Sequence, residues 1–182
     1  MDTEGRTVFV TRFLRPIRPP DELIENGETS LESTVNVAKF VQMIPFVADS
    51  LIFPGLCDIW SRCDQFLQIL AGDEEEHSVL LVNFFLGLGK KAWLLIGHSK
   101  LTGTSCFPLT REGDAYMIWF QGQPYKAKEP HNPIHCVCAL VDPTNVSMIY
   151  FIVSFHFSSR CIMKRSADTS KKSTSESDSD LW

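Results

Sequence analysis

The chain has 182 residues, of which 44% are hydrophobic and 21% are charged, and its formal net charge is −5. This length and composition suit one globular core followed by a tail and do not require two domains. The negative charge is mild and unclustered in the folded part, which argues against binding to nucleic acid. No apolar run reaches the roughly 18 residues of a membrane-spanning helix, and the N-terminus lacks the pattern of a signal peptide, so we expect a cytosolic product.

The N-terminal part changes from an extended to a helical pattern. Residues 8–13 predict a short strand that ends at the following prolines. We therefore expect residues 1–32 to be a linker or extended lead-in segment. Apolar residues then recur at helical spacing over residues 33–42, which predicts an amphipathic helix that stops before Pro45.

Two segments lead from this helix to the centre of the chain. Residues 46–53 are apolar with a short polar interruption, and we expect irregular backbone that packs on the core. Residues 57–70 repeat large apolar side chains at helical spacing, which predicts a second helix. Only a short turn separates this helix from the next one, so the two should pack together.

Residues 71–97 have the pattern of a helix start, a buried helix, a glycine stop and a buried strand. Asp73 is a suitable N-cap, and the carboxylates of Glu74, Glu75 and Glu76 stabilise the positive end of a helix dipole. The residues that follow are apolar around nearly the whole helix. We therefore expect this helix to be buried on most sides.

The end of the helix and the remainder of the chain favour turns and strands. Gly87 and Gly89 each offer the left-handed conformation that ends helices. Short strands are predicted at residues 92–96, 107–109, 115–120 and 135–141, with a hairpin turn at 111–114, a second turn at 121–124 and a loop at 126–133. Helices that precede strands predict an α+β fold, in which the helices pack on an antiparallel sheet.

The C-terminal part divides into three predicted regions. Residues 33–146 are expected to form the folded domain. Residues 147–157 are apolar and aromatic, and they could complete the sheet as an edge strand. Residues 158–182 are rich in serine and charge, which is typical of a disordered tail.

The central unit resembles the nucleophile segment of transglutaminase-like folds, which are relatives of the papain-like cysteine proteases. That segment has the pattern G-x-C-x-x-x-A, a helix, and then L-G-x-x-A. Gly72, Ser78, Leu88, Gly89 and Ala92 match it here. The resemblance implies a transglutaminase-like fold and leaves open whether its C-terminal part is complete.

The same resemblance assigns three catalytic positions, and all three are degenerate. Glu74 stands at the cysteine position, where a carboxylate cannot replace the thiolate that forms a thioester. Ser105 stands where the histidine should be, and Phe120 lies at or beside the position of the acid. The resemblance therefore favours the fold and argues against the reaction. We expect no enzyme activity and no cofactor.

Three longer segments resemble one family more closely. They are IPFVADSLIFPGLCDIW at residues 44–60, DQFLQILAGDEEEHSVLL at 64–81 and LGKKAWLLIG at 88–97. They resemble the region after the C2 domain in the coiled-coil and C2 domain-containing protein 2 family, and the likeness covers residues 8–146. It implies a non-catalytic scaffold in a ciliary transition-zone protein, at the transition zone and basal body. Other proteins of the transition-zone complex would be its partners, and it would contribute to cilium assembly.

The first helical turn also permits a binding hypothesis. A vestigial cleft could bind a basic or extended peptide, with Glu74, Glu75, His77 and Cys106 as its candidate residues. The helix dipole alone can account for three acids in a first turn, so a purely structural interpretation stands beside this one. For His77, a packed or surface imidazole near carboxylates is the corresponding structural interpretation.

Two other hypotheses follow from the same residues. The chain could be a cysteine-dependent hydrolase or transferase with a relocated nucleophile, for which Cys106 is the best candidate because it begins a strand that faces the cleft. No sequence pattern puts a histidine beside it. Alternatively, the chain could be a partial product that lacks full function.

One group of residues has the composition of a metal site. Cys136, Cys138, His131 and His135 are close together in the sequence. The Cys-x-Cys spacing differs from that of zinc sites, and two cysteines on one face of a short strand can be small core side chains. We predict no metal site.

Overall fold

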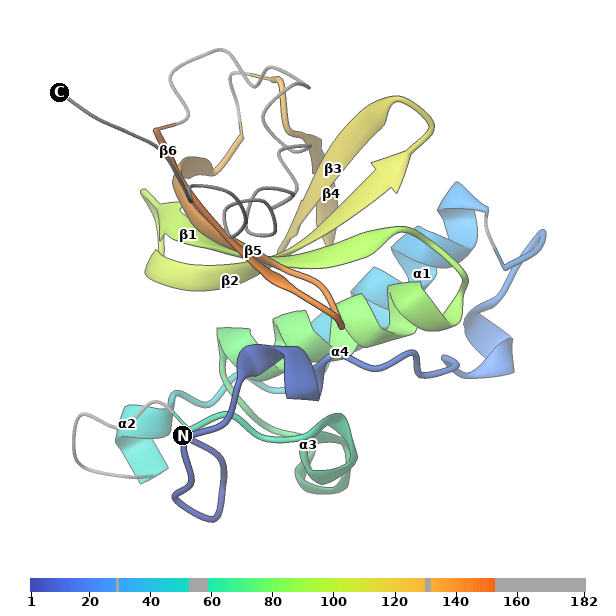
Figure 1. The fold of residues 1–182 in the computed structure, drawn as a ribbon. Helices are drawn as coiled ribbons and strands as arrows, with labels where there is room; N and C mark the ends of the chain where they lie inside the picture. The colour runs from blue at the N-terminus through green and yellow to red at the C-terminus, as the bar shows by residue number, and fades with distance from the viewer. Residues whose placement is uncertain (29, 53–58, 130–131, 153–182) are drawn as a thin grey trace, which may run out of the picture.

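A computed structural model describes residues 1–28, 30–52, 59–129 and 132–152. The chain forms one six-stranded antiparallel sheet with a layer of helices against one face, as Figure 1 shows. The order of the strands across the sheet is β4-β3-β2-β1-β5-β6. The predicted α+β layout is confirmed. Within the described residues, no helix combines the length and the apolar character needed to cross a bilayer.

Along the described part of the chain, all helical elements precede the strands. The helical elements are η1 (Val10–Phe13), η2 (Asp21–Leu23), α1 (Leu31–Gln42), α2 (Asp49–Ile52), α3 (Cys63–Ile69) and α4 (Glu74–Gly87). The strands are β1 (Ala92–Ser99), β2 (Gly103–Glu112), β3 (Ala115–Phe120), β4 (Gln123–Lys126), β5 (Ile134–Val141) and β6 (Val146–Ile152).

Helix α4 is the centre of the fold, between the sheet and the other helices (Figure 1). The carboxylate of Asp73 accepts a hydrogen bond from the amide of Glu75 at 3.0 Å, and Glu76 accepts one from the amide of Asp73 at 3.1 Å. This capping box fixes the start of the helix where the sequence predicted it. The helix contacts β1 and β2 on one side and α1 and α3 on others. Its side chains are therefore buried nearly all round, as predicted.

Gly87 and Gly89 have different roles at the end of α4. Gly89 has a φ of +72°, the left-handed conformation predicted for it. Gly87 does not have a positive φ. A Cβ atom at Gly87 would overlap the carbonyl oxygen of Ile17, so this position needs glycine for close packing. The prediction of a left-handed cap at Gly87 was therefore wrong.

The N-terminal segment differs from the strand predicted for residues 8–13. It forms the 3-10 helix η1 and turns Phe13 into the core, where that side chain is 7% exposed. Asn83 of α4 holds the turn, because its side chain donates to the carbonyl of Phe13 at 2.8 Å and accepts from the amide of Arg15 at 2.7 Å. This tertiary contact overrides the local preference for a strand. The lead-in segment is thus packed against α4.

The helix before α4 is shorter than the predicted span of residues 57–70. Helix α3 begins at Cys63, and the backbone of Trp60 forms a bridge with Asp2 instead of continuing a helix. Residues 57 and 58 lie outside the described residues. The predicted packing of this helix on α4 is confirmed. The backbone bridge between Asp2 and Trp60 holds Trp60 outside the helix, which is why the helical spacing of apolar residues overestimated the length of α3.

The segment at residues 46–53 was predicted to be irregular and packed on the core. Residues 49–52 instead form the short helix α2. Phe46 and Leu51 are 56% and 79% exposed, so at these two positions the prediction of core packing was wrong. Residue 53 lies outside the described residues.

The predicted strands are present, and several are longer than expected. Strand β2 runs through Pro108, which pairs opposite Leu94 of β1. The four residues of β4 were predicted as turn and loop, which was wrong, because a short edge strand that contains a proline gives little sequence signal. Strand β6 confirms the predicted edge strand as far as Ile152. Residues 153–157 and the predicted tail at 158–182 lie outside the described residues.

Candidate functional site

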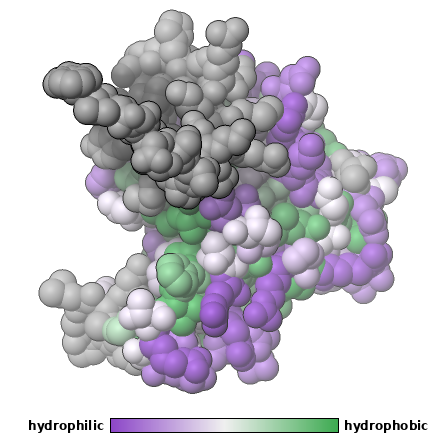
Figure 2. All heavy atoms as spheres, viewed as in Figure 1, coloured by the Kyte–Doolittle hydropathy of each residue, from purple (hydrophilic) through white to green (hydrophobic). Residues whose placement is uncertain are grey.

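A cavity of about 450 Å³ lies where the start of α4 meets the sheet. The end of α1, the first two turns of α4, strand β2 and the turn between β3 and β4 form its walls. On the face shown in Figure 2, hydrophobic residues reach the surface near the middle of the molecule, with hydrophilic residues below them in this view. The cavity has a mixed lining, with apolar side chains such as Val41, Leu81 and Trp119 beside a few polar ones.

The cavity brings together the three positions that the sequence assigned to a degenerate catalytic centre. Glu74 from α4, Ser105 from β2 and Phe120 from β3 all line it. His77 and Cys106, two of the residues proposed for a peptide cleft, line it as well. These residues are up to 46 positions apart in the sequence, as Glu74 and Phe120 show, and the fold alone unites them.

Glu74 presents its carboxylate at the wall of this cavity. The side chain is half-buried at the first position of α4, where the helix dipole stabilises a negative charge. Among the described residues it has no ion-pair partner, and it is the acidic member of the cavity lining. The adjacent Glu75 does not line the cavity, unlike the other three residues proposed for the cleft.

His77 connects two parts of the helical layer through its ring. Its Nδ1 atom lies 2.6 Å from the carbonyl oxygen of Asp73, and its Nε2 atom lies 3.0 Å from that of Ile44. The ring also packs edge-on against Phe66, with centroids 4.9 Å apart. Both nitrogens thus face main-chain oxygens. This geometry suits a structural role, in which the ring joins the start of α4 to the chain after α1. Neither ring nitrogen is directed at a thiol that it could activate.

Cys106 is buried, with 4% of its surface exposed. Its main-chain carbonyl accepts a hydrogen bond of 2.7 Å from the hydroxyl of Ser78, which fastens β2 to α4. The thiol of Cys63 accepts a hydrogen bond from the side-chain amide of Asn83 at 3.0 Å. Burial raises the pKa of the Cys63 thiol to about 11, so it stays protonated at neutral pH.

Two hydroxyl groups in the cavity have no hydrogen-bond partner among the described residues. Ser105 is 3% exposed and its Oγ atom is fully enclosed, and the Oγ1 atom of Thr102 is enclosed in the same way. Both residues line the cavity. Buried polar atoms are nearly always paired, so these two are exceptions, and their enclosure keeps both oxygen atoms out of contact with the interior of the cavity. No local sequence pattern pointed to Thr102, which precedes β2.

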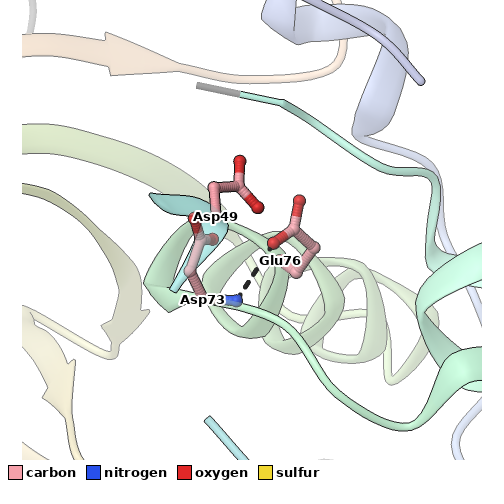
Figure 3. A group of neighbouring side chains, drawn as sticks. All are labelled: Asp49, Asp73 and Glu76. Carbon is pink, nitrogen blue, oxygen red and sulfur yellow. Dashed lines mark hydrogen bonds between the residues drawn. The ribbon is translucent and has the colours of Figure 1, made fainter. Parts of the chain in front are cut away.

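A separate cluster of carboxylates lies at the base of α4. Figure 3 shows Asp49, Asp73 and Glu76 converging from α2, the cap of α4 and its first turn. One oxygen of each lies within 4.8 Å of the others. Asp49 accepts from the amide of Ile59 at 2.7 Å, and Glu76 accepts from that of Ser61 at 3.0 Å. Oxygen ligands of this kind suit a hard divalent cation, but the amide donors explain the cluster without one.

The protonation of Glu76 holds this cluster together at neutral pH. Burial, together with the hydrogen bond and the charge of Asp73, raises the pKa of Glu76 to about 8. A neutral Glu76 can donate to Asp73, which relieves repulsion between the acids. The sequence placed Glu76 in the first turn of the helix but could not reveal Asp49 beside it.

The cysteine and histidine group for which we predicted no metal is only partly described. Cys136 is 8% exposed in β5, and Cys138 is half-buried at a shift in the register of β5 and β6. His135 stacks on His98 of β1 with ring centroids 5.6 Å apart. Since residue 131 lies outside the described residues, the absence of a metal stays a prediction.

Comparison with known proteins places this cavity in a peptidase-like domain. The family profile described as CEP76 peptidase-like domain matches residues 58–150, just over half of the chain. The chain belongs to this family. The CEP76 peptidase-like domain thus includes α3, α4 and most of the sheet.

Two relatives connect this peptidase-like domain to the predicted protein family. Protein CC2D2B of Homo sapiens is 36% identical over 146 residues, which are 79% of this chain and 10% of the relative. Coiled-coil and C2 domain-containing protein 2A of Drosophila melanogaster is 24% identical over 147 residues, which are 79% of this chain and 11% of the relative. The predicted likeness to that family is confirmed. The chain spans about a tenth of the length of these relatives.

A solved structure shares the fold of this peptidase-like domain. Legionella pneumophila LapG superposes with a TM-score of 0.57 over 70% of this chain and 72% of its own, at 13% identity. At that identity the likeness concerns the fold alone. Together with the family match, it confirms the predicted transglutaminase-like fold of the papain-like class.

Proposed function

We propose that this CEP76 peptidase-like domain is a non-catalytic scaffold and interaction module of a ciliary transition-zone protein. The observation that carries the proposal is Glu74 at the start of α4, in the lining of the cavity and at the position that the sequence resemblance assigns to the nucleophile. An enzyme of this fold forms a thioester through a thiolate, and a carboxylate does not support that intermediate. The module would act by binding, and so contribute to cilium assembly.

The other two catalytic roles are also unsupported by the residues in the cavity. The hydroxyl of Ser105 has no basic nitrogen with which to activate a nucleophile, and the ring of Phe120 cannot orient an imidazole through a hydrogen bond. What persists is a cavity with a defined shape. A cavity that lacks catalytic residues but keeps its shape suits recognition of a segment of another protein.

The proposed partners are other proteins of the transition-zone complex, with a peptide segment in the cavity as one mode of contact. The proposed location is cytoplasmic, at the transition zone and basal body. Both follow from the likeness to the coiled-coil and C2 domain-containing protein 2 family. The geometry of the cavity supports the binding role and does not by itself identify a cellular site.

Imaging of the tagged full chain in ciliated cells tests this role. We expect enrichment at basal bodies for the unaltered chain and for Glu75→Gln, whose side chain lies outside the cavity. Phe85→Asp puts a charge at a core position that is 0% exposed, and it should abolish recruitment because the module unfolds. A diffuse distribution of the unaltered chain would count against the proposal.

A further inference from the structure

We infer that Cys136 and Cys138 of β5 are a redox-active pair, which closes to a disulfide by exchange with a small-molecule disulfide of the glutathione type and reopens in excess thiol. This modification site is separate from the cavity, because no residue of β5 belongs to the cavity lining. The inference therefore goes beyond the proposed scaffold role and does not depend on it. Its basis is an irregularity of the sheet that brings two thiols of one strand together.

Cys138 occupies a bulge in both ladders of β5. The ladder with β1 pairs Ala139 with Ile96. The next pair in that ladder is Val137 with Gly97, so Cys138 has no counterpart in β1. In the ladder with β6 the register also shifts between Val137 and Ala139. A bulge bends its strand and redirects the side chain of the extra residue, so Cys138 departs from the regular alternation of β5.

The two thiols are in contact at this bulge. Burial, and after it the charge and the side-chain hydrogen bond of Cys136, raise the pKa of Cys138. The thiol of Cys136 also donates to the main-chain carbonyl of Val137 at 3.9 Å, so its sulfur is turned along β5. A Cβ atom at Gly97 of β1 would lie 2.5 Å from the carbonyl oxygen of Cys136. Only glycine fits beside the bulge, and this close packing holds the backbone there in place.

The spacing of the two residues meets the geometric requirement of a disulfide. At a rise of roughly 3.3 Å per residue, positions two apart in a strand have Cα atoms about 6.6 Å from each other. Disulfides span Cα separations of roughly 4.4–6.8 Å. The bend of the bulge brings the two residues closer than a regular strand would. The hydrogen bond between the thiols puts both side chains on the same side of β5, as the bond requires.

The exchange takes two balanced steps. Cys138 is half-buried and more exposed than Cys136, and its thiolate attacks one sulfur of glutathione disulfide and expels a glutathione thiolate. The thiolate of Cys136 then attacks the Cys138 sulfur of the mixed disulfide and expels the second glutathione. Both cysteines are oxidised, and one glutathione disulfide is reduced to two glutathione thiols that take up the two protons. Because the raised pKa of Cys138 leaves little thiolate at neutral pH, the first step is slow and the pair is best measured at equilibrium.

Mass spectrometry of the full chain equilibrated in glutathione buffers tests this inference. Free thiols are alkylated in denaturant, and trypsin then cleaves after Lys128 and Arg160 to release a peptide whose only cysteines are the pair. We expect this peptide to lack both labels and two hydrogen atoms. At a fixed glutathione concentration, the folded chain should need at least about tenfold less glutathione disulfide than the urea-unfolded chain, because the bulge holds the thiols together. Cys63 and Cys106 fall in separate tryptic peptides and should stay reduced, which makes them internal controls.

Two single variants separate the roles of the two thiols. In Cys136→Ser the mixed disulfide on Cys138 cannot be resolved, so a glutathione adduct should accumulate there. In Cys138→Ser the remaining thiol is 8% exposed and should form much less adduct. Equal ease of oxidation in the folded and unfolded chains, an adduct that persists on the unaltered chain, or a pair that stays reduced in every buffer would overturn the inference.

Discussion

Glu74 and Ser105 both line the cavity, and the resemblance to transglutaminase-like folds assigns them to the positions of the cysteine and the histidine. The carboxylate is well placed for the helix dipole, and the hydroxyl is buried without a partner among the described residues. His77 is held by two main-chain carbonyls, so its ring acts as a tie between α4 and the chain after α1. Each of these side chains suits binding or structure better than proton transfer.

Glu76 should make the free energy of unfolding depend on pH. Burial, together with Asp73, raises its pKa from an ordinary value of 4.5 to about 8, and Asp49 lies beside both. The folded chain therefore keeps this proton over a range in which the unfolded chain loses it. The stabilisation is fully present below pH 4.5 and is lost as the pH rises from there through about 8, by roughly 2–4 kcal/mol.

Urea unfolding at several pH values across this window measures the effect against Glu76→Gln. The amide mimics the protonated acid and does not titrate, so the variant should lose most of the decline between about pH 5 and 8. Glu75→Gln serves as the matched control and should keep it. A decline of the same size in Glu76→Gln and the unaltered chain would contradict the raised pKa.

At the scale of elements, α4 shows what a sequence can and cannot predict. Its cap, its first-turn acids and its apolar surface are local features, and they correctly predicted where the helix begins and that it is buried. The contacts of Asn83 with Phe13 and Arg15 join segments far apart in the chain, and no local pattern reports them. For that reason η1 was mistaken for a strand.

The two glycines at the end of α4 should respond differently to substitution. Gly87→Ala forces a methyl group against the main chain at Ile17, and it should lower the free energy of unfolding by at least about 2 kcal/mol. Gly89→Ala meets no atom within 4 Å and only strains a backbone with a φ of +72°, which should cost about 1 kcal/mol. Chemical denaturation of both variants would give these values. A larger loss for Gly89→Ala would refute the role assigned to Gly87.

At the scale of the whole molecule, the sequence predicted the layers of the fold and most strands. Short apolar runs next to predicted turns or loops identified β3 and β5. Strand β4 was missed, because it has only four residues, one of them Pro124, and so shows no recognisable strand pattern in the sequence. The motif predicted that Glu74, Ser105 and Phe120 belong together, and the cavity contains all three. Thr102 and the Asp49 cluster needed the folded chain to be found.

A thiol-reactive probe tests most directly whether the cavity retains any cysteine chemistry. We expect Cys106, which is 4% exposed, to react with iodoacetamide at neutral pH more slowly than it does in the urea-unfolded chain. His77→Ala should not change that rate, because the ring faces two carbonyl groups. Rapid labelling of Cys106 in the folded chain that disappears in His77→Ala would contradict the non-catalytic account.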